Sequence, residues 1–294
     1  MPELAYDLPL YRPPSEGENL IIQVTLGCSF NRCTFCSMYK SKEFQARDLA
    51  EVFSDIASAA EMQSDARRVF LADGDALVLP TDHLVAILDR LRTSLPELQR
   101  VSSYALPANL LKKSVDELRI LREHKLTLVY YGIESGSTDI LRRIRKGATP
   151  QGMIDGLNKA REAGIKTSCT VILGAGGMNR WREHIEATAE LVNAVAPNFV
   201  STLQLTLDET ARKDFLANFG EPFVFQNDEG ILAEQELFVS LLLPRSPVIF
   251  RSNHASNALP LAGTLPKDRL RLLAVIAAAR QGTLPLRPAW MRAL

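Results

Sequence analysis

The sequence predicts an α/β protein whose parallel strands form a full or partial barrel. Short β-rich runs alternate with longer amphipathic stretches. The early runs recur roughly every 30–40 residues, the spacing of strand–helix units. Runs such as Leu20–Leu26 and Leu126–Ile133 are apolar nearly throughout. Strands buried on both faces under covering helices have this composition, which indicates a parallel sheet.

The expected elements follow from local signals along the chain. Ser114 and Glu117 have the spacing of a capping box at a helix start. Thr149 and Pro150 place a cap residue before an N1 proline, and Gly164 closes that helix. The expected strands are Leu20–Leu26, Arg68–Ala72, Val101–Tyr104, Leu126–Ile133, Thr167–Leu173, Phe199–Leu205 and Pro247–Arg251.

Composition narrows the function classes. The chain has 294 residues, 46% of them hydrophobic and 23% charged, as is ordinary for a globular protein. Its 34 basic and 34 acidic residues give zero net charge, which argues against a nucleic-acid partner. No apolar run has the length of a membrane span, and the polar, proline-broken stretch 1–19 does not look like a secretory signal. We therefore expect a cytoplasmic protein without a membrane partner.

Three of the four cysteines lie on one short loop after the first strand. Cys28, Cys33 and Cys36 have the spacing C-x4-C-x2-C, whereas Cys169 is remote. A structural zinc site takes four Cys or His ligands, and the next histidine along the chain is His83. Three thiolates instead suit a [4Fe–4S] cluster with one iron open to an outside ligand. A zinc site and plain buried cysteines remain as alternatives, and we expect Cys169 to be a small core residue.

Other strand ends carry the next signals, where a barrel gathers its functional residues. Asp73-Gly74-Asp75 follows the second strand. Gly132-Ile133-Glu134-Ser135-Gly136 ends the fourth, and Ile172-Leu173-Gly174 ends the fifth. Asp-Gly and Gly-rich turns are common punctuation by themselves, so their order along the chain carries the argument.

In this order the motifs resemble the radical S-adenosylmethionine (radical SAM) superfamily, from about Leu20 to about Leu205. The usual motif there is C-x3-C-x2-C with an aromatic residue before the last cysteine. This chain keeps the aromatic residue, Phe35, and has one extra residue between Cys28 and Cys33. The resemblance implies a partial (β/α)6-type TIM barrel, the radical SAM core, with a C-terminal extension. We expect an N-terminal segment over 1–19, the core over 20–210 and the extension, closing the barrel mouth, over 211–294.

The resemblance also implies roles. Asp73-Gly74-Asp75 would be a variant of the Gly-Gly-Glu motif whose carbonyls bind the methionine amino group. Glu134 would face the ribose hydroxyls or the amino-acid end of SAM, and Lys146 or Arg145 would pair with the SAM carboxylate. A capping or salt-bridging glutamate at a loop and an exposed helix-end cation are the alternatives. The implied SAM contacts are Phe35, Asp73, Gly74, Asp75, Glu134, Ser135, Lys146, Ile172 and Gly174.

The implied activity is reductive cleavage of SAM at the [4Fe–4S] cluster, giving a 5′-deoxyadenosyl radical that abstracts hydrogen from a substrate. An electron donor such as a flavodoxin or ferredoxin would be a partner. A tRNA- or protein-modifying enzyme of the methylthiotransferase type is an alternative, because the GxESG segment is shared with it. A non-catalytic Fe–S or zinc-binding module is another.

The C-terminal third carries one polar burst after the strand Pro247–Arg251. Arg251, Asn253, His254 and Asn257 are expected to line the substrate pocket, with Arg251 and His254 as the catalytic candidates. The fork of donors on arginine suits a carboxylate or phosphate, so we expect an anionic substrate. A polar loop of turn-forming residues is the alternative. Further along, Thr264 and Pro266 are read as the start of a C-terminal helix.

Overall fold

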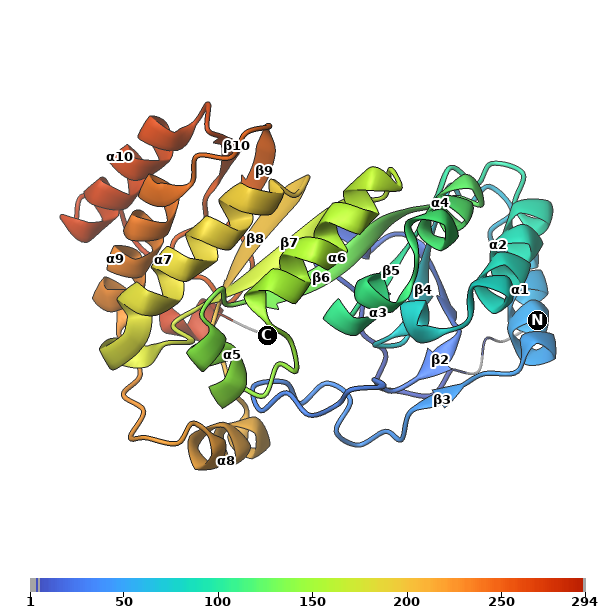
Figure 1. Ribbon diagram of the computed structural model, residues 1–294, viewed down its shortest axis with the longest axis horizontal. Helices are drawn as coiled ribbons and strands as arrows, with labels where there is room; N and C mark the ends of the chain where they lie inside the picture. Colours follow the sequence, from blue (N-terminus) through green and yellow to red (C-terminus); the bar gives the residue numbers. More distant parts are fainter. Residues whose placement is uncertain (1–3, 5, 293–294) are drawn as a thin grey trace. The chain divides into compact units, whose positions relative to one another are not determined.

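The computed structural model describes residue 4 and residues 6–292, and the chain divides into two compact units. Unit 1 comprises the described residues up to 31, residues 38–131 and residues 155–167. Unit 2 comprises residues 32–37, residues 132–154 and the chain from residue 168 onward. The ribbon in Figure 1 labels the elements of both.

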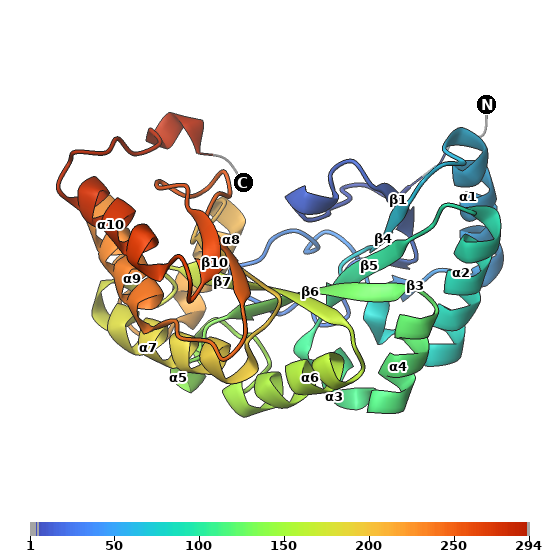
Figure 2. The ribbon, with the colours of Figure 1, turned by 90° about the horizontal axis from the view of Figure 1, so that it is seen from above.

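Unit 1 is a layer of parallel strands covered by helices. β1 pairs with β4, β4 with β5 and β5 with β6, all parallel. Figure 2 shows helices α1, α2 and α4 along the outer side of β4 and β5. The elements up to β6 are η1 (Pro14–Glu16), β1 (Leu20–Gln23), β2 (Thr25–Leu26), β3 (Gln45–Ala46), α1 (Leu49–Met62), β4 (Arg68–Ala72), η2 (Ala76–Val78), α2 (Thr81–Ser94), β5 (Arg100–Ala105), α3 (Pro107–Lys112), α4 (Val115–Glu123) and β6 (Leu126–Glu134).

Unit 2 continues the alternation and ends it with a reversed strand. β7 pairs parallel with β8 and β8 with β9, whereas β10 runs antiparallel to β9. Helix α9 packs against both α7 and α10, and the three are seen together in Figure 1. The remaining elements of the chain, of which α6 lies mostly in unit 1, are α5 (Thr138–Arg143), α6 (Pro150–Glu162), β7 (Lys166–Leu173), α7 (Gly177–Val195), β8 (Phe199–Gln204), α8 (Glu209–Asn218), α9 (Asp228–Leu241), β9 (Val248–Arg251), β10 (Ala262–Leu265), α10 (Arg269–Arg280) and η3 (Ala289–Met291).

The predicted α/β alternation of parallel strands and helices is confirmed, and all seven expected strands are present. One of them is interrupted: the run Leu20–Leu26 divides at Val24 into β1 and β2. β2 leaves β4 and pairs antiparallel with the two residues of β3. A two-residue strand such as β3 is too short to show the alternation that marks a strand in sequence.

The helix signals hold in two places and fail in a third. Ser114 and Glu117 form the expected capping box, and Thr149 Oγ1 accepts from Gly152 N at 3.1 Å. The expectation that Thr264 opens the last helix is wrong. Thr264 lies in β10 opposite Ile249, and α10 begins only at Arg269. Strand pairing with β9 competes successfully with the local cap signal at this point.

Each unit has a core of its own. In unit 1 the rings of Phe70, Tyr104 and Tyr130 pack edge to face. In unit 2 the side chains of Ile140, Ile144, Ile172, Ala175, Phe215 and Phe219 form an apolar cluster, which we call the phenylalanine cluster. Its members come from β7, α8 and the segment around α5. The predicted core residue Cys169 is fully buried in β7.

Within the described part of the chain, no helix combines the length and the apolar character needed to cross a membrane.

Removing the capping hydroxyl should destabilise α4. Ser114→Ala leaves the Glu117 N–H without its acceptor, so the free energy of unfolding should fall by about 0.5–2 kcal/mol in urea denaturation. The control Ser64→Ala alters an exposed serine outside any helix and should change it by less than about 0.5 kcal/mol. Equal values for the two variants would contradict a role for the capping box.

Candidate functional site

We call the segment that carries Cys28, Cys33 and Cys36 the cysteine loop. Its start lies in unit 1 and is held by the turn after β4. Asp73 Oδ2 accepts a hydrogen bond from Gly27 N at 3.2 Å, and Gly74 N donates to Gly27 O at 3.1 Å. The Ser29 hydroxyl donates to the carboxylate of Asp75. Three bonds thus fix the residues on either side of Cys28, and two of them use the aspartate side chains.

Asp73 is fully buried and pairs with a buried cation. Its Oδ2 lies 2.9 Å from Nζ of Lys42, whose side chain is only 4% exposed. The other oxygen, Oδ1, is also buried and has no hydrogen-bond donor among the described residues. A buried carboxylate oxygen of this kind can accept from an ammonium group of a bound ligand, a role that the resemblance assigned to the backbone carbonyls of this turn.

Gly74 is required by close packing. A Cβ at this position would come within 2.5 Å of the Tyr39 ring and 3.1 Å of the Cys28 Cβ. The turn after β4 therefore packs directly on the first cysteine, and a larger residue would displace it.

The pKa of the Asp75 carboxyl group lies close to neutral pH. Burial raises its pKa to about 7, while hydrogen bonds from Ser29 and Asn109 and the positive charges of Lys112 and Lys113 oppose the rise. The carboxyl group can therefore carry a proton near physiological pH.

The second half of the cysteine loop, residues 32–37, is held by unit 2. Thr34 N donates to Ile144 O at 3.1 Å, just beyond α5. The Phe35 ring packs against the phenylalanine cluster, and the Ser37 hydroxyl hydrogen-bonds to Asp208, lowering the pKa of that carboxyl. The segment with Cys33 and Cys36 therefore has both backbone and side-chain anchors.

Glu134 and Lys146 form a buried ion pair. Their Oε1 and Nζ atoms are 2.9 Å apart, and the side chains are 10% and 6% exposed. Nζ also lies 5.9 Å from the centre of the Phe35 ring. Burial by itself would lower the pKa of Lys146. The charges of Glu134 and of the Cys33 and Cys36 thiolates outweigh it and leave that pKa raised.

This ion pair explains a glycine of the GxESG segment. A Cβ at Gly132 would lie 1.9 Å from Glu134 Oε1 and 2.7 Å from Lys146 Nζ. Because Gly132 has no side chain, the Glu134 carboxylate and the Lys146 ammonium group have room to meet beside it. The structure thus gives Lys146 a protein partner, Glu134, whereas the sequence suggested pairing with SAM.

Three further predicted SAM contacts belong to one buried polar network. They are Ser135, Ile172 and Gly174. His184 Nε2 lies 2.9 Å from Ile172 O, and its Nδ1 lies 2.8 Å from Ser135 Oγ. Because a carbonyl only accepts, Nε2 carries the hydrogen and Nδ1 accepts from the serine hydroxyl. Glu234 Oε1 accepts from Gly174 N at 2.8 Å and lies 3.5 Å from His184 Nε2.

The two titratable groups of this network are both shifted by burial. Burial lowers the pKa of His184 to about 4 and raises that of Glu234 to about 8. Gly174 N and the amide of Gln226 donate to Glu234 and oppose its shift. At neutral pH the histidine is therefore an uncharged hydrogen-bonding group.

The polar residues that end β9 and follow it differ in their surroundings. The Arg251 guanidinium lies 5.4 Å from the centre of the Phe199 ring. His254 is half-buried, its Nδ1 is 2.9 Å from Ser256 Oγ, and burial lowers its pKa. The side-chain amide of Asn257 binds the backbone of β8 twice: Nδ2 donates to Thr202 O (2.7 Å), and Oδ1 accepts from Gln204 N (2.7 Å). Asn257 therefore pins its loop to β8.

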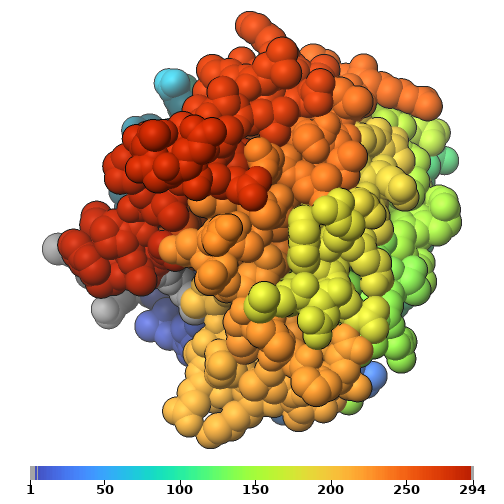
Figure 3. Space-filling model, turned by 90° about the vertical axis from the view of Figure 1, so that its left-hand side faces the viewer, coloured from blue at the N-terminus to red at the C-terminus, as the bar shows by residue number. Residues whose placement is uncertain are grey.

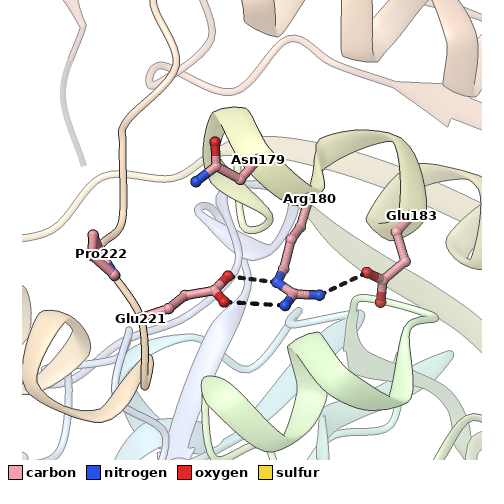
Figure 4. A pocket seen from close by; sticks show the side chains of 5 residues that line it. All are labelled: Asn179, Arg180, Glu183, Glu221 and Pro222. Carbon is pink, nitrogen blue, oxygen red and sulfur yellow. Dashed lines mark hydrogen bonds and ion pairs between the residues drawn. The ribbon is translucent and has the colours of Figure 1, made fainter.

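A surface pocket of unit 2 lies at the start of α7 and is lined by ion-paired side chains (Figure 4). Arg180 is bonded by Glu221 at 2.5 Å and by Glu183 at 3.1 Å. Arg180 also lies 3.3 Å from Asp139 of α5. These contacts tie α5, α7 and the segment after α8 together, and none of the predicted site residues lines the pocket.

Sequence reasoning missed the residues that hold the motifs in place. Lys42 and Glu234 are buried titratable residues whose partners are far along the chain, at Asp73 and Gly174. His184, which the motifs do not include, is fully buried in α7. The usable signal was the pair of aspartates, Asp73 and Asp75, where the related motif has glycine and glutamate.

The donor set fits the implied cofactors. Three thiols on one loop are the ligands that Fe–S clusters take. Cys28 belongs to unit 1, and Cys33 and Cys36 belong to unit 2. Over residue 4 and residues 6–292, no three His, Cys, Asp or Glu side chains stand grouped as a metal site.

Alternating parallel strands and helices with polar loops at the strand ends define an α/β enzyme core of the barrel type. The chain belongs to the radical SAM superfamily, whose sequence model matches residues 22–192. Members of this family use a [4Fe–4S] cluster and SAM.

Individual relatives are more distant. The chain is 27% identical over 187 residues to a protein of Methanocaldococcus jannaschii provisionally named a methylthiotransferase, covering 58% of this chain and 40% of that protein. It is 27% identical over 192 residues to an uncharacterised methyltransferase of Pyrococcus horikoshii, covering 64% and 40%. The chain thus spans about two fifths of these relatives.

The fold likeness extends to solved structures. Coproporphyrinogen III oxidase from Escherichia coli, described as a radical SAM enzyme, superposes with a TM-score of 0.54 at 17% identity. The match covers 76% of this chain and 52% of the oxidase. This likeness supports the fold.

Breaking the buried ion pair should be costly. Lys146→Met leaves Glu134 as a buried charge without its partner, so the free energy of unfolding should fall by about 3–5 kcal/mol in urea. Adding Glu134→Gln removes that charge and should restore about 1–3 kcal/mol. Lys213→Met, which breaks an exposed pair with Glu209, should cost less than about 1 kcal/mol. Additive effects of the two buried substitutions would contradict the pairing.

His184 should stay uncharged in the folded protein at mildly acidic pH. Its pKa is lowered to about 4, so between pH 6.5 and 4 the unfolded chain binds a proton there that the folded chain does not. Its contribution to the free energy of unfolding therefore rises with pH across that window. In NMR, the ring resonances of His184 should not move between pH 7.5 and 5.5. A midpoint near 6.5 would contradict the buried network.

Proposed function

We propose that the protein is a radical SAM enzyme that cleaves SAM reductively at a [4Fe–4S] cluster. The observation that carries the proposal is the cysteine loop, whose two halves are both anchored. Asp73 and Asp75 hold the residues beside Cys28, and the Ile144 carbonyl holds the segment between Cys33 and Cys36. Each half of the loop is held within its own unit, and the three thiols that the loop carries are the ligand set of a [4Fe–4S] cluster.

Cys28, Cys33 and Cys36 would hold the cluster. Asp73, Gly74 and Asp75 of unit 1, together with Phe35, Glu134, Ser135, Lys146, Ile172 and Gly174 of unit 2, would contact SAM. When bound, the reduced cluster supplies the electron that cleaves SAM to methionine and a 5′-deoxyadenosyl radical, which takes hydrogen from the substrate. An electron donor such as a flavodoxin or ferredoxin would deliver that electron.

The chain's own side chains would orient the bound cofactors and shield the cysteine segment from water. Lys146 places a positive charge near Cys33 and Cys36, which favours their thiolate forms. The Phe35 ring and the phenylalanine cluster exclude water on one side of this segment. Glu134 has an oxygen beyond the one that binds Lys146, and it can accept from hydroxyl groups of the nucleoside.

Localisation and domain roles are part of the same proposal. We place the protein in the cytoplasm, with the core over 20–210 and the extension over 211–294 as the substrate region. Within that extension, Arg251 and His254 are the candidates for contacts to an anionic substrate.

The second candidate is a methylthiotransferase-like or methyltransferase activity on tRNA or protein. It is favoured by the names of the two archaeal relatives, which match about two fifths of their own length. The zero net charge argues against an RNA partner. Transfer of an isotope-labelled methyl group from SAM to a macromolecule would distinguish this activity from cleavage to 5′-deoxyadenosine alone.

The cysteine assignment gives a direct test. Protein reconstituted without oxygen should hold about four irons per chain and, when reduced, release methionine and 5′-deoxyadenosine from SAM in equal amounts. Changing any one of Cys28, Cys33 or Cys36 to Ser should abolish both properties, because each removes one ligand. Cys169→Ser, in the core of β7, is the matched control and should keep both. Stoichiometric zinc without iron would refute the proposal.

The substrate region can be tested without knowing the substrate. A deproteinised cell extract that speeds 5′-deoxyadenosine formation by the wild type should lose at least about 90% of this effect with Arg251→Ala or His254→Ala, as one strong hydrogen bond is worth tenfold or more. Cluster content and the rate without extract should stay unchanged. Lys267→Ala, which removes an exposed positive charge, should behave as the wild type. Full stimulation of both variants would remove these residues from the pocket.

A further inference from the structure

Helix α9 reaches the turn after β7 with two residues on one of its faces. Ile231 and Glu234 are three positions apart, so they lie on the same side of the helix. Glu234 Oε1 accepts from Gly174 N at 2.8 Å. A Cβ on Gly174, whose φ is +84°, would lie 3.0 Å from Ile231 Cδ1. The helix thus fixes the turn through one polar and one apolar contact.

We propose that Glu234 is a positioning residue for SAM, supplied by the C-terminal region to the ends of β6 and β7. It fixes the Gly174 turn directly. Through its contact with His184 it belongs to the network that also holds Ile172 O and Ser135 Oγ. This proposal rests on the proposed function, in which these three residues contact SAM.

Burying Glu234 and His184 costs desolvation free energy, which indicates that their polar contacts are specific. Glu234 and His184 are both fully buried, and isolated buried carboxyl groups are rare because desolvation is expensive. The carboxyl accepts hydrogen bonds from two donors, Gly174 N and the Gln226 amide, and His184 Nε2 lies 3.5 Å from it. An apolar side chain in place of Glu234 would leave the Gly174 N–H without an acceptor.

The position of α9 in unit 2 agrees with this role. The helix packs against α7, which carries His184. Figure 3 shows the outer face of unit 2, where the yellow side chains of α7 adjoin the orange and red ones of the C-terminal helices. Glu234 itself has no exposed surface, so it cannot serve as a surface recognition residue.

The test compares SAM affinity in variants that keep their cluster. Glu234→Ala removes the acceptor for Gly174 N and should raise the Kd for SAM at least about tenfold, with iron content unchanged. Glu234→Gln keeps an amide oxygen in the same place and should restore the Kd to within about threefold of the wild type. In the cluster-free protein, the Gly174 amide should exchange its hydrogen faster in Glu234→Ala than in the wild type or Glu234→Gln.

A matched control separates positioning from general loosening of the helix. Gln235 is the next residue of α9, is also buried, and donates to Ser252 Oγ at 2.6 Å, away from the β7 turn. Gln235→Ala should lower the unfolding midpoint as Glu234→Ala does, yet leave the Kd for SAM within about twofold of the wild type.

The outcomes are distinct from those of the proposed function. If the wild type binds no SAM, the proposed function fails. If the wild type binds SAM and Glu234→Ala binds it equally well, or Gln235→Ala weakens it as much, the positioning role fails. Should Glu234→Ala not fold, Glu234→Asp, which withdraws the carboxyl by one methylene, replaces it. That variant should still raise the Kd several-fold, and an unchanged Kd would overturn the proposal.

Discussion

The segment that carries three of the four cysteines has almost no regular secondary structure, so its path depends on buried polar groups around it. On one half these are the carboxyl groups of Asp73 and Asp75, which bind Gly27 and Ser29. On the other half they are the Ile144 carbonyl and the charge of Lys146. Without such partners a loop of this length would sample many conformations, and three thiols would seldom meet one metal group.

The buried charges occur in compensated pairs. Lys42 forms an ion pair with Asp73 and Lys146 forms one with Glu134, each with an N–O distance of 2.9 Å. Removal of one partner is far more costly than replacement of both, which ties the residues of each pair to each other. Glu234 is different, because its compensation comes mainly from neutral donors, and its pKa is raised to about 8. A group of this kind can be buried at neutral pH by holding a proton.

Periodicity and spacing predicted the strands, the starts of α4 and α6 and the positions of the motifs. These signals are local, and the strand ends of a parallel sheet place local motifs at a common edge without further information. The partners of the motifs could not be predicted. Glu234 lies 60 positions from Gly174, and no local pattern of α9 distinguishes it from an exposed helical glutamate. Thr264 shows the converse, since a valid cap signal yielded to pairing with β9.

The contact of Ile231 and Glu234 with the Gly174 turn has a consequence for how such proteins diversify. The family's sequence model ends at residue 192, before α9. Helix α9 nevertheless supplies the acceptor for the Gly174 N–H at the end of β7, so the C-terminal region is not a module that evolution can exchange freely. A new C-terminal region acquired by fusion would have to bring an acceptor for the Gly174 N–H and an apolar side chain beside it. Lineages that lack them would need a different residue at the end of β7.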